Sequence, residues 1–160
     1  MPEGSDVYAD FVKSLLDAES LRKSSLEQRG IGIITSSGAL VTLLFGLIAV
    51  ITSSKTFVLH ARVHGWLAAA AILFVLAALA GIVMNVPLFY GQIVVTEGEL
   101  RASWDDTAAD AQAAVTGVRL KRLGQASKLN TIKAWILILG VLLELAALII
   151  LVIGIFEIIN

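Results

Sequence analysis

The sequence predicts an all-α integral membrane protein that crosses the bilayer three times. Apolar residues make up 58% of the 160 residues, only 16% are charged, and the mean hydropathy is +0.87, far above that of a soluble domain. Three apolar runs are each long enough to cross about 30 Å of hydrocarbon. They cover residues 31–52, 65–89 and 134–158, and no internal repeat divides the chain, so one membrane domain is expected.

The segment before the first span, residues 5–29, is expected to form an amphipathic helix outside the membrane. Ser5 is a suitable N-cap, and basic residues stand near the end of the segment, where the helix dipole favours them. Val7, Phe11 and Leu15 recur every four residues, and adjacent rows hold Val12, Leu16 and residues 19–23, which makes one face apolar. We expect that face to pack on another helix.

The first two spans differ in composition. The span over residues 31–52 begins with small and hydroxylated residues, which allow another helix to approach closely. The span over residues 65–89 is rich in alanine and is followed by polar and proline residues at its end, Asn85 and Pro87. We expect Pro87 to interrupt the helix hydrogen bonds there.

The segment between the second and third spans is too long for a simple hairpin, and its pattern is helical. Apolar residues step by threes and fours along one seam, as in a coiled coil: Leu100, Trp104, Ala108, Ala111, Val115 and Val118. Ser103 is a suitable N-cap. We expect a cytoplasmic helix over residues 100–132 that packs on the helix over residues 5–29 and runs on into the span over residues 134–158.

Basic residues predict the orientation, because they collect on the cytoplasmic side of a membrane. Ten of the twelve flank one side: Lys13, Arg22, Lys23, Arg29, Arg101, Arg119, Lys121, Arg122, Lys128 and Lys133. Only Lys55 and Arg62 lie on the other side. The expected protein is therefore a multi-pass protein of a bacterial inner (plasma) membrane, with a cytoplasmic N-terminus and an external C-terminus.

Glu144 and Asn85 are the candidate pore or packing residues. Glu144 stands about ten residues into its span, close to the bilayer midplane, where a carboxylate costs about 2.5 kcal/mol or more. Two interpretations remain open. Glu144 lines a cation path or forms a proton site in an oligomer, or it is protonated and bonds a Ser or Thr of the first span.

The sequence offers almost no convergent catalytic chemistry. It lacks cysteine, a glycine-rich phosphate loop and a metalloprotease motif, and the pair His60 and His64 has no carboxylate beside it in the loop. We therefore expect no enzyme, no cofactor, no metal site and no nucleic-acid partner. The remaining site candidates are basic residues that contact anionic lipid heads or an anionic ligand: Arg22, Lys23, Arg119, Lys121 and Arg122.

A resemblance adds a functional expectation. The stretch from Asp17 to Gly30, DAESLRKSSLEQRG, runs into TSSGAL at Thr35 to Leu40, and together they resemble small actinobacterial membrane proteins and, more distantly, the Pycsar transmembrane effectors and their SLATT-like relatives. The resemblance implies an effector of anti-phage defence that perturbs the inner membrane after a partner cyclase makes a cyclic-nucleotide messenger.

The expected function is therefore that of a non-enzymatic, homo-oligomeric membrane effector that forms a pore or otherwise perturbs the bilayer. The alternative is an accessory or structural subunit of a larger membrane complex, without conductance of its own. An effector is toxic when overexpressed and self-associates, whereas an accessory subunit is harmless and co-purifies with other chains.

Overall fold

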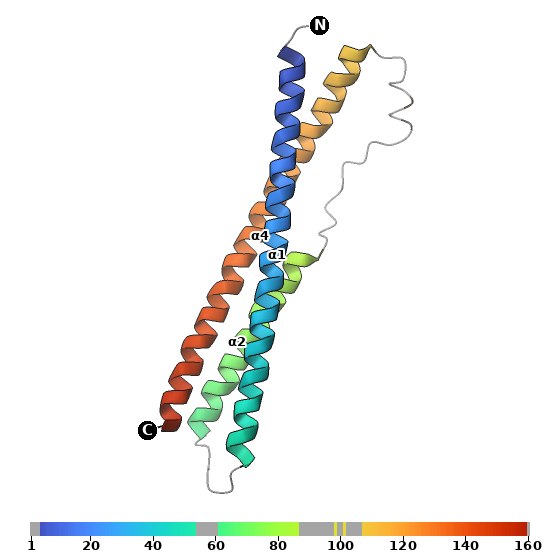
Figure 1. The fold of residues 1–160 in the computed structure, drawn as a ribbon. Coiled ribbons are helices and arrows are strands. Elements are labelled where there is room, and N and C mark those ends of the chain that lie inside the picture. Colours follow the sequence, from blue (N-terminus) through green and yellow to red (C-terminus); the bar gives the residue numbers. More distant parts are fainter. Residues whose placement is uncertain (1–3, 54–60, 87–97, 99–100, 102–106, 160) are drawn as a thin grey trace. The chain divides into compact units, whose positions relative to one another are not determined.

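The computed structural model describes residues 4–53, 61–86, 98, 101 and 107–159. Three long helices account for nearly all of these residues: α1 spans Gly4–Ser53, α2 spans Ala61–Asn85 and α4 spans Ala108–Ile159 (Figure 1). Each contains a segment long and apolar enough to cross a membrane, and the described residues include no strand. The expectation of an all-α chain with three apolar helices is confirmed.

Helix α1 corrects the expected division between an outer helix over residues 5–29 and a span over residues 31–52. It continues through Gly30 and Gly32 as one helix of 50 residues, about 75 Å long. Two glycines cost a helix only about 1 kcal/mol each, and the segment contains no proline to break it. Hydroxyl groups in the apolar part bond back to carbonyls one turn earlier, as Thr35 does to Ile31 and Thr42 to Gly38.

Helix α4 runs without a break into its apolar half, as the sequence indicated. Its N-cap is Thr107: the Thr107 hydroxyl accepts a bond from the Asp110 backbone N–H and donates one to the Asp110 carboxylate. Ser103, the expected cap, and Leu100, the expected start, lie outside the described residues.

Helix α2 ends at Asn85, two residues before Pro87 in the sequence. The expected span over residues 65–89 therefore corresponds to a helix shifted about one turn toward the N-terminus. A proline disfavours helical geometry in the residue before it, which accounts for the end of the helix at this point.

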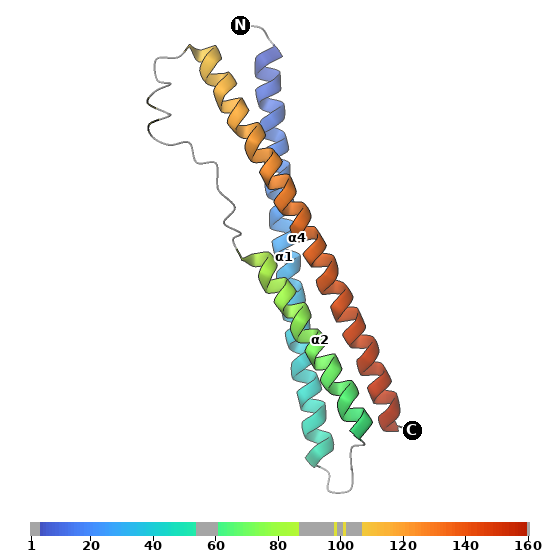
Figure 2. The same ribbon diagram turned by 180° about the vertical axis from the view of Figure 1, so that it is seen from behind.

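The chain divides into two compact units. Unit 1 holds residues 1–25 and 87–132, and unit 2 holds residues 26–86 and 133–160. In unit 2, the second half of α1, the whole of α2 and the second half of α4 lie side by side in both views (Figures 1 and 2). Helices α1 and α4 run parallel there, and α2 runs antiparallel to both.

The core of unit 2 follows alternating spacings of three and four residues, the repeat of a coiled coil. The buried residues of α2 show it throughout: Val63, Leu67, Ala70, Phe74, Ala77, Gly81 and Met84. Two apolar clusters fill the interior. Leu44 packs with Val63 and Leu67 in one, and Ala70 and Phe74 pack with Ala147 in the other.

Glycines allow the closest helix contacts in unit 2. A Cβ atom added at Gly81 would lie 2.7 Å from the carbonyl oxygen of Gly30, so α1 and α2 touch backbone to backbone at this point. A Cβ atom at Gly140 would lie 3.2 Å from Ile33 Cδ1, and one at Gly154 would lie 3.2 Å from Trp66 Cβ. Such small residues let helices approach where lipid gives no hydrophobic drive for packing.

Unit 1 pairs the first part of α1 with the first part of α4 in parallel, and only part of the expected apolar face of α1 is buried there. Ala9 and Val12 are buried, whereas Val7 and Phe11 are 70% and 57% exposed. Of the expected apolar face, Val12 in the adjacent row is buried, whereas Val7 and Phe11 in the fourfold row are not. The two helices do pack on each other, as expected.

Candidate functional site

Two ionisable residues of unit 2 lie on the seam between α1 and α4. Lys133 and Glu144 occupy seam positions of α4 that are three turns apart, and each bonds a residue of α1. Because an ionisable residue in an apolar span is costly, these two contacts are the strongest functional candidates in unit 2.

The first contact is an ion pair. Lys133 Nζ lies 2.5 Å from Glu27 Oε1, with the lysine side chain 5% exposed and the glutamate side chain 31% exposed. In the sequence, Lys133 directly precedes the third apolar run and Glu27 precedes the first by one turn. The pair therefore stands at the same end of both apolar segments, where the expected membrane begins.

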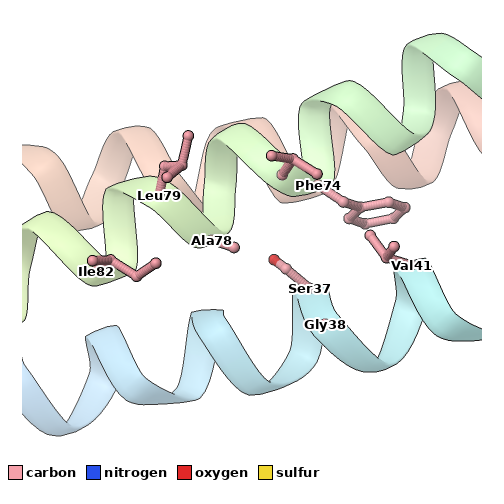
Figure 3. A pocket seen from close by; sticks show the side chains of 8 residues that line it. Ser37, Gly38, Val41, Phe74, Ala78, Leu79 and Ile82 are labelled. Carbon is pink, nitrogen blue, oxygen red and sulfur yellow. The ribbon is translucent and has the colours of Figure 1, made fainter.

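The second contact joins Ser37 and Glu144. Ser37 is fully buried, and its hydroxyl donates to Glu144 Oε1 over 3.4 Å. Hydroxyl–carboxylate bonds are ordinarily about 2.5–3.0 Å long, so this bond is weak. Figure 3 shows Ser37 projecting from α1 into the space between the helices. The contact is of the packing kind that the sequence left open beside the pore interpretation.

Asn85 belongs to another contact. Its side-chain Nδ2 donates to the carbonyl oxygen of Gly81 over 2.9 Å, and a Cβ atom at Gly30 would lie 3.0 Å from the same nitrogen. Asn85 thus packs where α1 and α2 approach most closely. Gly30 and Ser37 are two turns, about 10 Å, apart on α1, so the structure does not bring Asn85 and Glu144 together.

The five basic candidates of unit 1 form two groups at different levels. Asp6 bonds Gln112 and Glu19 bonds Asn130, which sets the register of α1 beside α4. These contacts place the group Arg119, Lys121 and Arg122 between them and the group Arg22 and Lys23 beyond the second, roughly 9–16 Å further along the axis. Arg22 also contacts Glu19 at 3.4 Å in its own helix.

Sequence reasoning missed the polar contacts that join α1 and α4. Asn130 is buried, and its Nδ2 donates to both the backbone oxygen of Glu19, at 2.8 Å, and the Glu19 carboxylate, at 2.6 Å. Gln112 Nε2 donates to Asp6 Oδ1 at 2.7 Å. The available signal was the alternation of threes and fours along α4, in which polar residues take the seam positions: Gln112, Thr116, Arg119, Asn130, Lys133 and Glu144.

Other polar groups offer little chemistry. Among the described residues no group of three His, Asp or Glu side chains is placed to hold a metal ion. His64 is exposed, and His60 lies outside the described residues. The indole Nε1 of Trp66 is buried without a hydrogen-bond partner among the described residues, while Trp135 is 68% exposed.

Comparison with known proteins yields no relative: no family model matches the chain, and no curated protein or solved structure matches it either.

Proposed function

We propose that the chain is a non-enzymatic, self-associating protein of a bacterial plasma membrane. It perturbs this membrane when the helical segments of unit 1 receive a signal. One observation carries the proposal. Glu144 lies deep in an apolar helix and is held only through a weak, 3.4 Å bond from Ser37 among the contacts described for it. A carboxylate in such a place is costly, so its presence favours a role beyond packing.

The proposed action uses the weakness of this bond. A small shift of α1 against α4 exchanges the Ser37 hydroxyl for water or a cation at the Glu144 carboxylate, at little cost. Three helices of one chain do not surround a water path, so several copies must contribute Glu144 to line one. Self-association is therefore a necessary part of the proposal.

The proposed signal reaches unit 1, in which the basic residues lie. Their separation into two groups roughly 9–16 Å apart favours contact of each group with anionic lipid heads over one shared nucleotide site. A cyclic-nucleotide ligand or a partner cyclase therefore rests on the sequence resemblance alone. The excess of basic residues in the same segments supports a cytoplasmic N-terminus and an external C-terminus.

An accessory subunit of a larger membrane complex is the second candidate. The observation that favours it is the internal satisfaction of the polar seam residues: Lys133 is paired with Glu27, and Glu144 is bonded by Ser37. A helix bundle that only packs against other chains would satisfy its polar residues in this way.

Ion flux separates the two candidates. The purified chain is placed in liposomes over a range of protein-to-lipid ratios, and the release of a trapped cation is measured. An oligomeric effector gives a flux that rises more steeply than linearly with protein density, and its expression arrests cell growth. Liposomes that stay tight at every density, together with harmless expression, contradict the proposal and favour the accessory subunit.

A further inference from the structure

We propose that two copies of this chain pack in parallel, α1 against α1, through an exposed row of small residues. This row, the α1 stripe, consists of Gly32, Thr35, Ala39, Thr42, Gly46 and Ala49, and all six are exposed in the single chain. The inference deepens the proposed function, since it names the surface on which the self-association required there rests.

The composition of the α1 stripe is unlike that of a surface that faces lipid. Helix α4 supplies the comparison within the same unit, because its exposed residues from Trp135 to Phe156 are all large and apolar. Lipid chains cover large side chains readily and do not require small ones. Small residues that recur by threes and fours are instead the pattern by which membrane helices approach each other closely.

The glycines of the chain support the same surface. Contacts within the chain account for three of the glycines. An added Cβ atom would meet a neighbouring helix within 3.3 Å at Gly30, Gly81 and Gly140. Gly32 and Gly46 are not accounted for in this way, since an added Cβ atom at either would meet nothing within 4 Å, as is also the case at Gly38, Gly65, Gly117 and Gly124. The lack of a side chain at Gly32 and Gly46 serves no contact in the single chain and fits a contact with a second one.

The repeat of the α1 stripe continues toward the N-terminus of α1. Counting back from Gly32 by alternating fours and threes reaches both polar and apolar residues: Gln28, Ser25, Leu21, Ala18, Ser14, Phe11 and Val7. Leu21, Phe11 and Val7 are 72%, 57% and 70% exposed in unit 1. Large apolar residues exposed there, on the same repeat, indicate that the contact extends beyond the apolar segment.

Charges beside the α1 stripe select a parallel second copy. In a parallel coiled coil, a residue that directly precedes every second position of the repeat faces the residue numbered five higher on the other helix. Asp17 therefore faces Arg22 of the second copy, twice by symmetry. An antiparallel pair sets like flanks together, Asp10 and Asp17 on one side and Arg22 and Arg29 on the other, which is repulsive.

A groove beside the α1 stripe has room for a side chain of the second copy. It has a volume of about 250 Å³ and is lined by Ser37, Gly38 and Val41 of α1 and by apolar residues of α2 (Figure 3). By the same count of five, Gly38 faces Leu43 of the second copy, and Leu43 is 69% exposed in the single chain. The large side chain thus meets the glycine at the groove.

Disulfide crosslinking tests the interface directly, because the chain has no cysteine of its own. Single variants Thr35→Cys, Ala39→Cys and Thr42→Cys are oxidised in native membranes. Leu142→Cys and Ile149→Cys on α4 are the controls, since both are exposed and the parallel register sets them level with Thr35 and Thr42. The stripe variants should form disulfide dimers several-fold more than the controls. Equal crosslinking at all five positions, or more on α4, overturns the inference.

A disruptive variant gives the second readout. Gly46→Leu adds a side chain where nothing in its own chain lies within 4 Å, so the single chain should keep its thermal stability while Thr42→Cys crosslinking falls several-fold in the double variant. Val152→Leu on α4 should leave the crosslinking unchanged. Crosslinking requires neither toxicity nor flux, so a dimer without flux contradicts only the proposed function, and flux with crosslinks elsewhere contradicts only this interface.

Discussion

Lys133 on α4 and Glu27 on α1 form an ion pair in unit 2, and the two partners differ in access to solvent. The lysine side chain is 5% exposed, whereas the glutamate side chain is 31% exposed. A charge left in the more buried position costs more than one left in the more exposed position. The two partners should therefore respond unequally to substitution.

Glu27→Gln should destabilise unit 2 more than Lys133→Met does. The first change leaves a buried ammonium without its opposite charge, at a cost of about 1–3 kcal/mol, while the second leaves a carboxylate that can reach solvent. The double variant should recover part of the loss, as double-mutant cycles show for coupled pairs. Thermal unfolding in mild detergent, followed by circular dichroism, measures all three. An equal loss in both single variants would show that the unequal exposure has no energetic effect.

Asn130 should hold α4 in register beside α1 within unit 1. Asn130→Ala removes two bonds to Glu19 and should lower the free energy of unfolding by about 1–3 kcal/mol. Asn130→Asp should lower it further, because its carboxylate would face that of Glu19. Chemical unfolding in detergent measures both against Lys128→Ala, an exposed control on the same helix that should change the value by less than about 0.5 kcal/mol. A silent Asn130→Ala variant would contradict this role.

The sequence was sufficient to predict the apolar helices but not to predict which residues of other helices they contact. Long apolar runs identify α2 and the apolar parts of α1 and α4, because hydropathy depends on composition alone. The sequence did not show that α1 continues through Gly30, because a glycine is found both where a helix ends and where two helices approach closely. The structure shows that Gly30 permits a close approach, because its backbone contacts Gly81 of α2. That contact involves a helix some 50 residues away in the sequence.

The residues of the candidate site could likewise be predicted only in part. One of the two interpretations left open for Glu144 was a bond to a Ser or Thr of the first span, but several such residues stand there, and only packing selects Ser37. In unit 1 the expected apolar face held Val7, Phe11 and Val12, and the structure buries Val12 together with Ala9 and leaves Val7 and Phe11 exposed. The polar seam residues of α4 had no visible partner in the sequence, because periodicity identifies a face and not what it meets.

Gly81 should be essential for the contact between α1 and α2. Gly81→Ala places a Cβ atom 2.7 Å from the Gly30 carbonyl oxygen, so the helices must separate, at about 1–3 kcal/mol. Gly65→Ala on the same helix meets nothing within 4 Å and should be neutral or slightly stabilising. Thermal unfolding of both variants in detergent checks the difference. If both variants have the same midpoint, the close approach is not required for stability.

Variants of Glu144 should show whether this residue has a conducting role or a packing role. Glu144→Gln retains shape and hydrogen bonding but removes the charge, and Glu144→Leu removes both. If the carboxylate lines a water path, both variants should abolish ion flux while still inserting and assembling. If Glu144 only packs, the Gln variant should be nearly silent and the Leu variant should lose about 0.6–2 kcal/mol of stability. Flux from liposomes with equal protein incorporation is the deciding measurement.

Ser37→Ala supplies the matched control for Glu144, because it removes the donor and leaves the carboxylate in place. A conducting role predicts that this variant retains or increases the flux, since water or a cation takes the position of the lost hydroxyl. A packing role predicts a loss of about 0.6 kcal/mol and no flux in any variant. Unchanged flux in Glu144→Gln contradicts the conducting role, because the carboxylate charge would then contribute nothing to the path.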